Sequence, residues 1–337
     1  MPVTHVAGTK AFRYLDNIGK IGDIGMSFFY PYGVARGKED IIYVANWGLE
    51  FRPCARISKI KISTQEWLMD IGHPDNGKPD EEFLWPGHLI TDHEENLHVT
   101  DQANHKIVSF TKNGEFISKW GTAGSNEGEF YRPSGIALDL DGNFVIADAT
   151  NHRIQTYSPQ GQYISQFGTN GSGHGQLQDP WGTFVDREGN IFVADWGNSR
   201  VQKFSAAGNF ISEIGHCGSG QGELNHPSAV AVDKDGDIYI ADWGNNRVVV
   251  YEEDGTFLVS INGDATNLSR WAEYTVSGSP DLKKALDRVD LEPMSRLWHP
   301  SALHVGDDYK ILIAEAQHQR IQIYEKEPIH QEAQFTL

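Results

Sequence analysis

Short runs of hydrophobic residues alternate with polar residues along this chain, and the same set of runs recurs. Residues 134–168 contain four such runs, rich in β-branched and aromatic residues: SGIALDL, NFVIAD, RIQTYS and QYISQFG. The segments between them (DG, a polar bend and PQG) have the composition of turns. A period of two predicts β-strands, whereas a helix requires a period near 3.6. Each repeat therefore predicts four short antiparallel strands.

The repeats are 47 residues apart in the central part of the chain. They are marked by a proline and by an acid 15 residues later: Pro86, Pro133, Pro180 and Pro227, then Asp101, Asp148, Asp195 and Asp242. The same 15-residue interval joins Pro31 to Asn46 and Pro300 to Glu315, which adds a first and a sixth copy. Six repeats of four strands predict an all-β fold, a six-bladed β-propeller, in a single domain spanning residues 1–337.

The two ends of the chain are predicted to close the ring. The sixth repeat ends after its third strand, at residues 321–325. Residues 11–19, AFRYLDNIG, resemble the fourth strands of the other repeats. We expect this N-terminal strand to complete the last blade, because pairing there removes two open sheet edges.

One long connection interrupts the pattern between the fifth and sixth repeats, at residues 264–298. Within it, Ser279 is a candidate N-cap, and Leu282, Leu286 and Val289 follow at helical spacing. The segment predicts a helical insert. Two roles remain open for it: a lid over the mouth of the central channel, or a contact between protomers of an oligomer.

The runs DGNFVIADATNHRIQTYSPQGQYISQFG and DGDIYIADWGNNRVVVYEEDGTFL resemble NHL repeats, a family of six-bladed propellers. The resemblance implies the fold, but function depends on sites carried by the fold. Known relatives include RNA-binding domains, sensors, scaffolds and a lyase that cleaves peptidyl-hydroxyglycine. In that lyase, zinc-binding histidines directly follow the blade prolines. The matching positions here are Tyr32, Gly87, Ser134, Trp181, Ser228 and Ser301. The zinc triad is therefore absent as a motif, and we expect neither a metal nor a cofactor.

Composition narrows the possible partners. With 28 basic and 46 acidic residues, the chain has a net charge of −18, which disfavours binding to a nucleic acid backbone. It contains no apolar run of 18 residues and no hydrophobic leader, so we expect no membrane partner. Two cysteines without CxxC spacing, Cys54 and Cys217, are typical of reduced thiols and predict a cytoplasmic location.

The acid of each repeat is followed by a base, in most repeats five residues later: Lys106, Arg153, Arg200, Arg247 and Arg320. In NHL repeats such pairs tie neighbouring strands together, so we interpret them as structural braces. The first repeat differs, because Asn46 replaces the acid and five extra residues precede Arg56. We expect function to replace the brace at that point.

The position after the acid varies between repeats: Trp47, Gln102, Ala149, Trp196, Trp243 and Ala316. Folding does not require tryptophan there, because three copies have glutamine or alanine. Trp181 and Trp298 lie in connections that reach the same face of a propeller. Two interpretations remain open: packing against a neighbouring blade, or an aromatic rim that binds a ligand.

His88 is the main candidate for chemistry. It lies two residues after its proline, where the other copies have Gly33, Gly135, Gly182, Ala229 and Ala302. There it begins an innermost strand and faces the channel, so we expect it to transfer a proton or orient a ligand. Glu50 and Arg52, in the extra residues beside Trp47, complete the candidate catalytic set. Ordinary packing remains the alternative for His88.

Two functions of different class follow. The first is an enzyme or binding protein for a small, partly apolar organic ligand, with lyase, hydrolase or isomerase chemistry open. The tryptophan-rich face and the insert favour it. The second is a non-catalytic scaffold that docks a partner protein. It is favoured by the lack of a nucleophile–base motif such as GxSxG.

Overall fold

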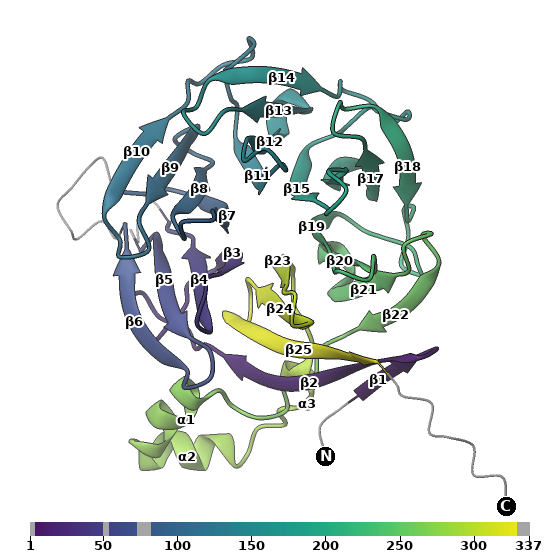
Figure 1. The fold of residues 1–337 in the computed structure, drawn as a ribbon. Coiled ribbons are helices and arrows are strands. Elements are labelled where there is room, and N and C mark those ends of the chain that lie inside the picture. Colours follow the sequence, from purple (N-terminus) through teal and green to yellow (C-terminus); the bar gives the residue numbers. More distant parts are fainter. Residues whose placement is uncertain (1–3, 50–53, 73–81, 329–337) are drawn as a thin grey trace, which may run out of the picture.

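The structure is a computed structural model that describes residues 4–49, 54–72 and 82–328. Six antiparallel blades surround a central axis, which confirms the predicted six-bladed propeller (Figure 1). The innermost strands each begin at a repeat proline: β3 (Pro31–Arg36), β7 (Pro86–Thr91), β11 (Pro133–Leu138), β15 (Pro180–Val185), β19 (Pro227–Val232) and β23 (Pro300–Val305). Proline suits this position because no ladder hydrogen bond is needed at the first residue of a strand.

The second, third and outer strands follow in chain order within each blade. The second strands are β4 (Ile41–Asn46), β8 (Leu97–Asp101), β12 (Phe144–Asp148), β16 (Ile191–Asp195), β20 (Ile238–Asp242) and β24 (Lys310–Glu315). The third are β5 (Arg56–Lys61), β9 (Lys106–Phe110), β13 (Arg153–Tyr157), β17 (Arg200–Phe204), β21 (Arg247–Tyr251) and β25 (Arg320–Pro328). The outer strands of the first five blades are β6 (Glu66–Ile71), β10 (Phe116–Trp120), β14 (Tyr163–Phe167), β18 (Phe210–Ile214) and β22 (Phe257–Ile261).

The N-terminal strand closes the ring as predicted. Strand β2 (Lys10–Ile18) pairs antiparallel with β25 and is the fourth strand of the last blade. A further strand, β1 (Thr4–Ala7), pairs with β2 and gives this blade a fifth strand. The repeat pattern could not predict β1 because the strand occurs only once in the chain.

The acid–base pairs act as buried braces in four blades. In the fourth blade, Arg200 Nε donates to Asp195 Oδ2 at 2.9 Å, and the arginine also donates to the carbonyls of Gly173 and Gln176. The same ion pair occurs at 2.8 Å in blades three and five and at 2.6 Å in blade six. Each guanidinium therefore ties its own strand to the loop that enters the blade.

The first two blades use other partners. Lys106 donates to the carbonyl of Gly121. In the first blade Arg56 Nε lies 3.3 Å from Asp70 on the outer strand. Asn46 is fully buried, and its Oδ1 accepts from the backbone N–H of Phe29. The expectation that function replaces the brace at Asn46 is therefore wrong for Asn46 itself, whose side chain is used for packing and backbone hydrogen bonding.

The predicted helical insert is present as α1 (Arg270–Ser277), α2 (Pro280–Leu286) and α3 (Glu292–Ser295). The hydroxyl of Ser279 caps α2 by accepting from Leu282 N. Trp271 of α1 is buried against Phe28, and its indole N–H donates to the Gln65 carbonyl at 2.6 Å. Helices α1 and α2 lie outside the ring, beside β2 and β6, rather than across the channel (Figure 1). In this structure they do not cover the channel mouth.

Candidate functional site

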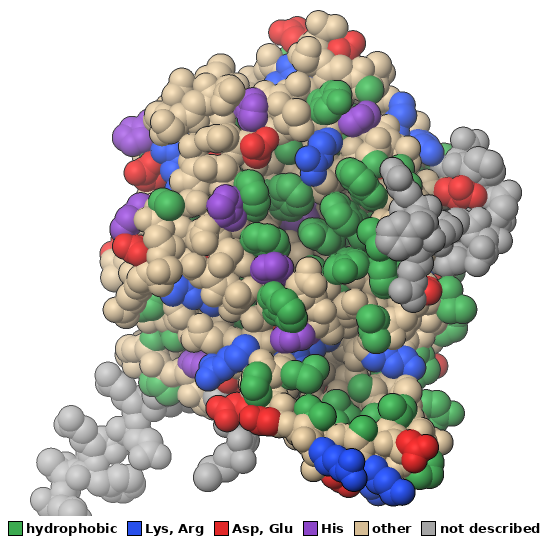
Figure 2. Space-filling view, turned by 180° about the vertical axis from the view of Figure 1, so that it is seen from behind, with side chains coloured by type: hydrophobic (Ala, Val, Ile, Leu, Met, Phe, Trp, Pro, Cys, Tyr) green, Lys and Arg blue, Asp and Glu red, His purple; other side chains and the backbone are tan. Residues whose placement is uncertain are grey.

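One face of the propeller carries the beginnings of the innermost strands and the turns between second and third strands. Figure 2 shows hydrophobic and histidine side chains gathered around the centre of this face. The rings that surround the centre are called the aromatic rim here: Tyr32, Trp47, Trp85, Trp181, Trp196, His226, Trp243, Trp298 and His299. The five tryptophans predicted to bind a ligand all belong to it.

On the first two blades the aromatic rim is a stack of three rings. Trp47 lies 4.3 Å from Tyr32 and 5.3 Å from Trp85, with interplanar angles of 24° and 26°. All three rings are half-buried. One face of each outer ring of the stack is therefore not covered by the other two.

On the opposite blades, tryptophan and histidine rings alternate. Trp196 lies 4.1 Å from His226, and Trp243 stacks on His299 at 3.9 Å and 15°. Trp196 also links the two neighbouring tryptophans, with Trp181 at 6.2 Å and Trp243 at 6.4 Å. Trp298 is 47 % exposed, the largest exposed aromatic surface among the five predicted tryptophans. Part of each ring is thus used for packing between blades, and the ligand-binding interpretation of the tryptophans stays a prediction.

Several polar atoms around the aromatic rim are buried with no hydrogen-bond partner in the described part of the chain: Trp47 Nε1, Gln102 Nε2, Arg132 Nε and His299 Nδ1. The first three are donors. Arg132 Nη2 donates to Gln102 Oε1 at 3.5 Å, and its guanidinium lies 5.9 Å from the Trp181 ring. Since unpaired buried donors cost free energy, a bound acceptor would stabilise them.

The turn histidines have structural roles. His105 Nδ1 accepts from the backbone N–H of Arg132 at 3.0 Å, and His152 Nδ1 accepts from Asp179 at 3.1 Å. In the next blade Ser199 accepts the corresponding hydrogen bond from His226. These side chains tie each turn to the residue before the next blade's proline, so they need no ligand to explain them.

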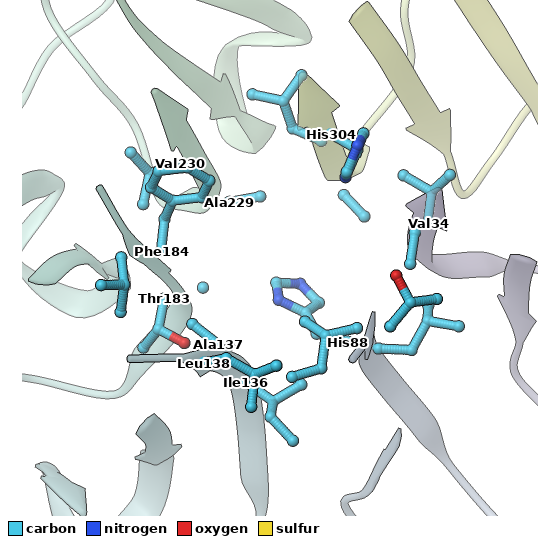
Figure 3. A pocket seen from close by; sticks show the side chains of 18 residues that line it. Val34, His88, Ile136, Ala137, Leu138, Thr183, Phe184, Ala229, Val230 and His304 are labelled. Carbon is cyan, nitrogen blue, oxygen red and sulfur yellow. The ribbon is translucent and has the colours of Figure 1, made fainter. Parts of the chain in front are cut away.

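His88 enters the central channel from β7 (Figure 3). Its Nε2 atom is buried and has no hydrogen-bond partner among the described residues. Burial lowers the pKa of His88 to about 4, against a weaker opposing effect of a backbone hydrogen bond with Ser301. The imidazole is therefore neutral at pH 7. A group of such low basicity is a poor proton acceptor but remains able to form a hydrogen bond to a ligand.

Of the small residues at the equivalent positions of other blades, Gly182 makes room for His88, and Gly135 allows a close approach of the next innermost strand. A Cβ added to Gly182 would lie 3.2 Å from His88 Cε1, and one added to Gly135 would lie 2.5 Å from the Trp181 carbonyl oxygen. The imidazole thus reaches from the second blade to the fourth. A larger side chain at position 182 would therefore collide with this imidazole.

Beyond His88 the channel contains a cavity of about 200 Å³, lined mainly by apolar side chains of the innermost strands. A second imidazole, His304, enters it from β23 (Figure 3). Burial lowers the pKa of His304 to about 4 as well, and the nearby Arg36 charge acts in the same direction.

The sequence comparison missed three residues of this region. His304 lies four residues after its proline, where other copies have Ala35, Ile90, Ala137, Phe184 and Ala231. The comparison that singled out His88, applied two residues further on, would have found it. Arg132 and Gln102 carry no such signal, because arginine and glutamine are common surface residues. Glu50 and Arg52 lie outside the described residues.

Neither a metal centre nor a membrane span is visible in the residues that the structure describes. No group of three or more His, Cys, Asp or Glu side chains is arranged to hold a metal ion there. No helix in the same part of the chain is long and apolar enough to cross a bilayer.

A family model described as a 6-bladed β-propeller matches residues 80–175 and 182–278, more than half of the chain. Curated proteins gave no match. A structural genomics protein of unknown function from Bacteroides thetaiotaomicron is 17 % identical, with a TM-score of 0.67 over 94 % of this chain and 76 % of that chain.

Two further solved structures have the same fold. Virginiamycin B lyase from Staphylococcus aureus is 13 % identical, with a TM-score of 0.57 over 93 % of this chain and 99 % of that chain. A chain of a nidogen/laminin complex is 16 % identical, with a TM-score of 0.53 over 77 % of this chain and 92 % of that chain. At these identities the likeness shows the fold alone.

Proposed function

The chain belongs to this family of 6-bladed β-propellers, and we propose that its aromatic rim binds a small, partly apolar organic ligand that carries a hydrogen-bond acceptor. The buried donors without partners around the rim, Trp47 Nε1, Gln102 Nε2 and Arg132 Nε in the described chain, are the observation that carries this proposal.

The aromatic rings supply the apolar part of the site. Half-buried tryptophans such as Trp181 and Trp196 have lost much of their freedom of movement through contact with their neighbours. A flat ligand can therefore stack on them at a small cost in side-chain entropy.

The polar part favours a carboxylate or carbonyl group. Arg132 and Gln102 lie together at 3.5 Å, and both have a donor without a partner among the described residues. A guanidinium donor to a carboxylate forms a stronger hydrogen bond than a neutral pair. The arginine also attracts an anion locally within a chain whose net charge is −18.

In this proposal His88 does not transfer a proton, because its pKa of about 4 makes it a weak base at pH 7. One similar structure is a catalytically inactive virginiamycin B lyase with quinupristin, so a propeller of this fold holds an organic ligand in another protein. A catalytic role for this chain is therefore compatible with the proposal, provided that the reaction does not use His88 as a base.

The proposal is tested with aromatic carboxylates, indole-3-acetate and benzoate, titrated while tryptophan fluorescence and melting temperature are recorded. Arg132→Ala should weaken binding by roughly tenfold to a hundredfold, the loss of a charge-assisted hydrogen bond. Trp196→Ala should weaken it about threefold to tenfold. Tyr274→Ala on α1, where the ring is 76 % exposed, is the control and should leave binding unchanged.

Equal dissociation constants in the wild type, Arg132→Ala and Trp196→Ala would refute the proposal. If neither probe binds at all, an acceptor-bearing aromatic ligand is the wrong class. The aromatic rim would then fit the alternative, a surface that docks a partner protein.

A further inference from the structure

We propose that the central channel is a second binding site, separate from the aromatic rim, for a small neutral ring compound that carries one hydroxyl or N–H group. The site is the cavity between His88 and the far end of the channel, lined by the innermost strands of the blades (Figure 3).

Different groups lie near the two ends of the channel. His88 is the third residue of β7 and so lies near the end where the aromatic rim is. At the opposite end, two ion pairs join different blades: Arg36 to Asp308 and Arg187 to Asp307, each at 2.5 Å. The cavity therefore lies between His88, near the aromatic rim, and two ion pairs at the opposite face.

The size of the cavity selects single rings. Its volume is about 200 Å³, and an apolar cavity of roughly 150 Å³ is large enough to take up benzene. Small residues leave the space open, notably Ala35, Ala137 and Gly182. Bulkier residues, Ile90 and Phe184, also line the cavity, and the Phe184 ring offers a flat apolar surface.

The two imidazoles select one polar group. A neutral imidazole has one donor and one acceptor nitrogen, and a hydroxyl can both donate and accept. A hydroxyl can therefore pair with His88 Nε2, which has no partner within the described residues, whichever tautomer is present. His304 offers a second imidazole on the other side of the same cavity.

The cavity excludes charged molecules. Burial lowers the pKa of both His88 and His304 to about 4, which means that a positive charge is destabilised at these points. No lining residue of the cavity carries a charge at pH 7 to pair with a carboxylate or an ammonium. Since an unpaired buried ion is costly, the channel should reject the carboxylates that suit the aromatic rim.

Phenol, benzene and benzoate are suitable probes, measured by calorimetry at pH 7. Phenol should bind, benzene should bind about threefold to tenfold more weakly for want of one hydrogen bond, and benzoate should not enter the channel. A crystal soaked with 4-bromophenol should place the bromine anomalous signal between the innermost strands. That signal distinguishes the channel from the aromatic rim.

Two substitutions sharpen the test. His88→Leu replaces the imidazole with an apolar side chain of similar size and should abolish the preference for phenol over benzene. Ala137→Phe fills the cavity and should abolish binding of both. If Ala137→Phe does not fold, Ala35→Leu serves the same purpose. Tyr274→Ala should leave phenol binding unchanged.

A bromine signal confined to the aromatic rim, or no phenol binding at millimolar concentration, would overturn this inference and mean that the channel holds only water. If the rim proposal holds, benzoate binding should be weakened by Arg132→Ala and left unchanged by Ala137→Phe, whether or not the channel binds phenol. The two proposals therefore fail or succeed independently.

Discussion

Replacing Lys326 with methionine should destabilise the fold strongly. Lys326 lies near the end of β25, and its Nζ atom is 2.5 Å from Asp233, 2.9 Å from Asp235 and 2.9 Å from Asp237. The ammonium group is thus surrounded by the three carboxylates of the β19–β20 turn and balances part of their negative charge. Its side chain is only 2 % exposed, and those of Asp233 and Asp237 are 0 % and 2 % exposed.

The magnitude follows from this burial. Burial by itself lowers the pKa of Lys326, but hydrogen bonds with the three carboxylates outweigh it and raise the pKa. Methionine would leave Asp233 and Asp237 buried with less compensation, although Lys10 still pairs with Asp237 at 2.6 Å. Removing one partner of a buried ion pair costs about 3–5 kcal/mol. For 337 residues this corresponds to a decrease in melting temperature of about 4–7 °C.

Measuring Lys326→Met in an Asp237→Asn background tests whether the buried carboxylates cause the loss of stability. Three other blades have asparagine where the fifth has Asp237, and Asn143 Nδ2 donates to Asp139 at 2.9 Å in the third blade. Asp237→Asn removes one carboxylate, so the cost of Lys326→Met should fall by about 1 kcal/mol or more in that background. Lys112→Met is the control, because its pair with Glu95 is exposed and contributes less than about 1 kcal/mol.

Urea unfolding at pH 7.5, followed by tryptophan fluorescence and circular dichroism, measures all four variants and the wild type. The reasoning is refuted if Lys326→Met costs no more than Lys112→Met. It is also refuted if the cost of Lys326→Met is the same in the wild-type and Asp237→Asn backgrounds.

Two further outcomes are expected. Arg200→Ala should lower the free energy of unfolding in urea by roughly 2–4 kcal/mol, because it leaves buried Asp195 without its guanidinium partner. Lys106→Ala should lower it by only about 1 kcal/mol, because Lys106 donates to a backbone carbonyl. Equal losses in the two variants would contradict the role of Arg200 as a brace. Stability should fall as the pH drops from about 6.5 to 4, since the unfolded chain protonates His88 and His304 below about 6.5 and the folded protein only below about 4. The free energy of unfolding should fall by about 3 kcal/mol for each of these histidines. When each protein is compared with its own stability at pH 7, His88→Leu should therefore lose less stability on acidification than the wild type.

The propeller could be predicted because its signals are local and repeated. Alternation with a period of two, turn residues and the proline–acid interval act within one repeat, so a single copy such as residues 134–168 already predicts a blade. Closure by β2 was predictable for the same reason, since residues 11–19 resemble the fourth strands elsewhere. The brace of Asp195 and Arg200 is also local, because an antiparallel turn brings two residues five apart into register.

The candidate site depends on residues that are far apart in the sequence. Comparison of the copies identified His88 as an exception, but only the folded ring shows that its nitrogen has no partner within the described chain and that it shares a cavity with His304. Arg132 and Gln102 come together across a blade boundary, which no repeat register encodes.

The position of the helical insert and the surroundings of Lys326 depend on contacts between distant parts of the chain. Whether the insert lies over the channel or beside the ring depends on where Trp271 is buried, and its partners, Phe28 and Gln65, are more than 200 residues away in sequence. The position of Lys326 among three carboxylates likewise required β25 to be placed beside another blade. Sequence by itself determined the blades, because hydrogen bonds within a blade join neighbouring segments. Tertiary structure decided the cavities and buried charges, because burial depends on which distant side chains exclude water.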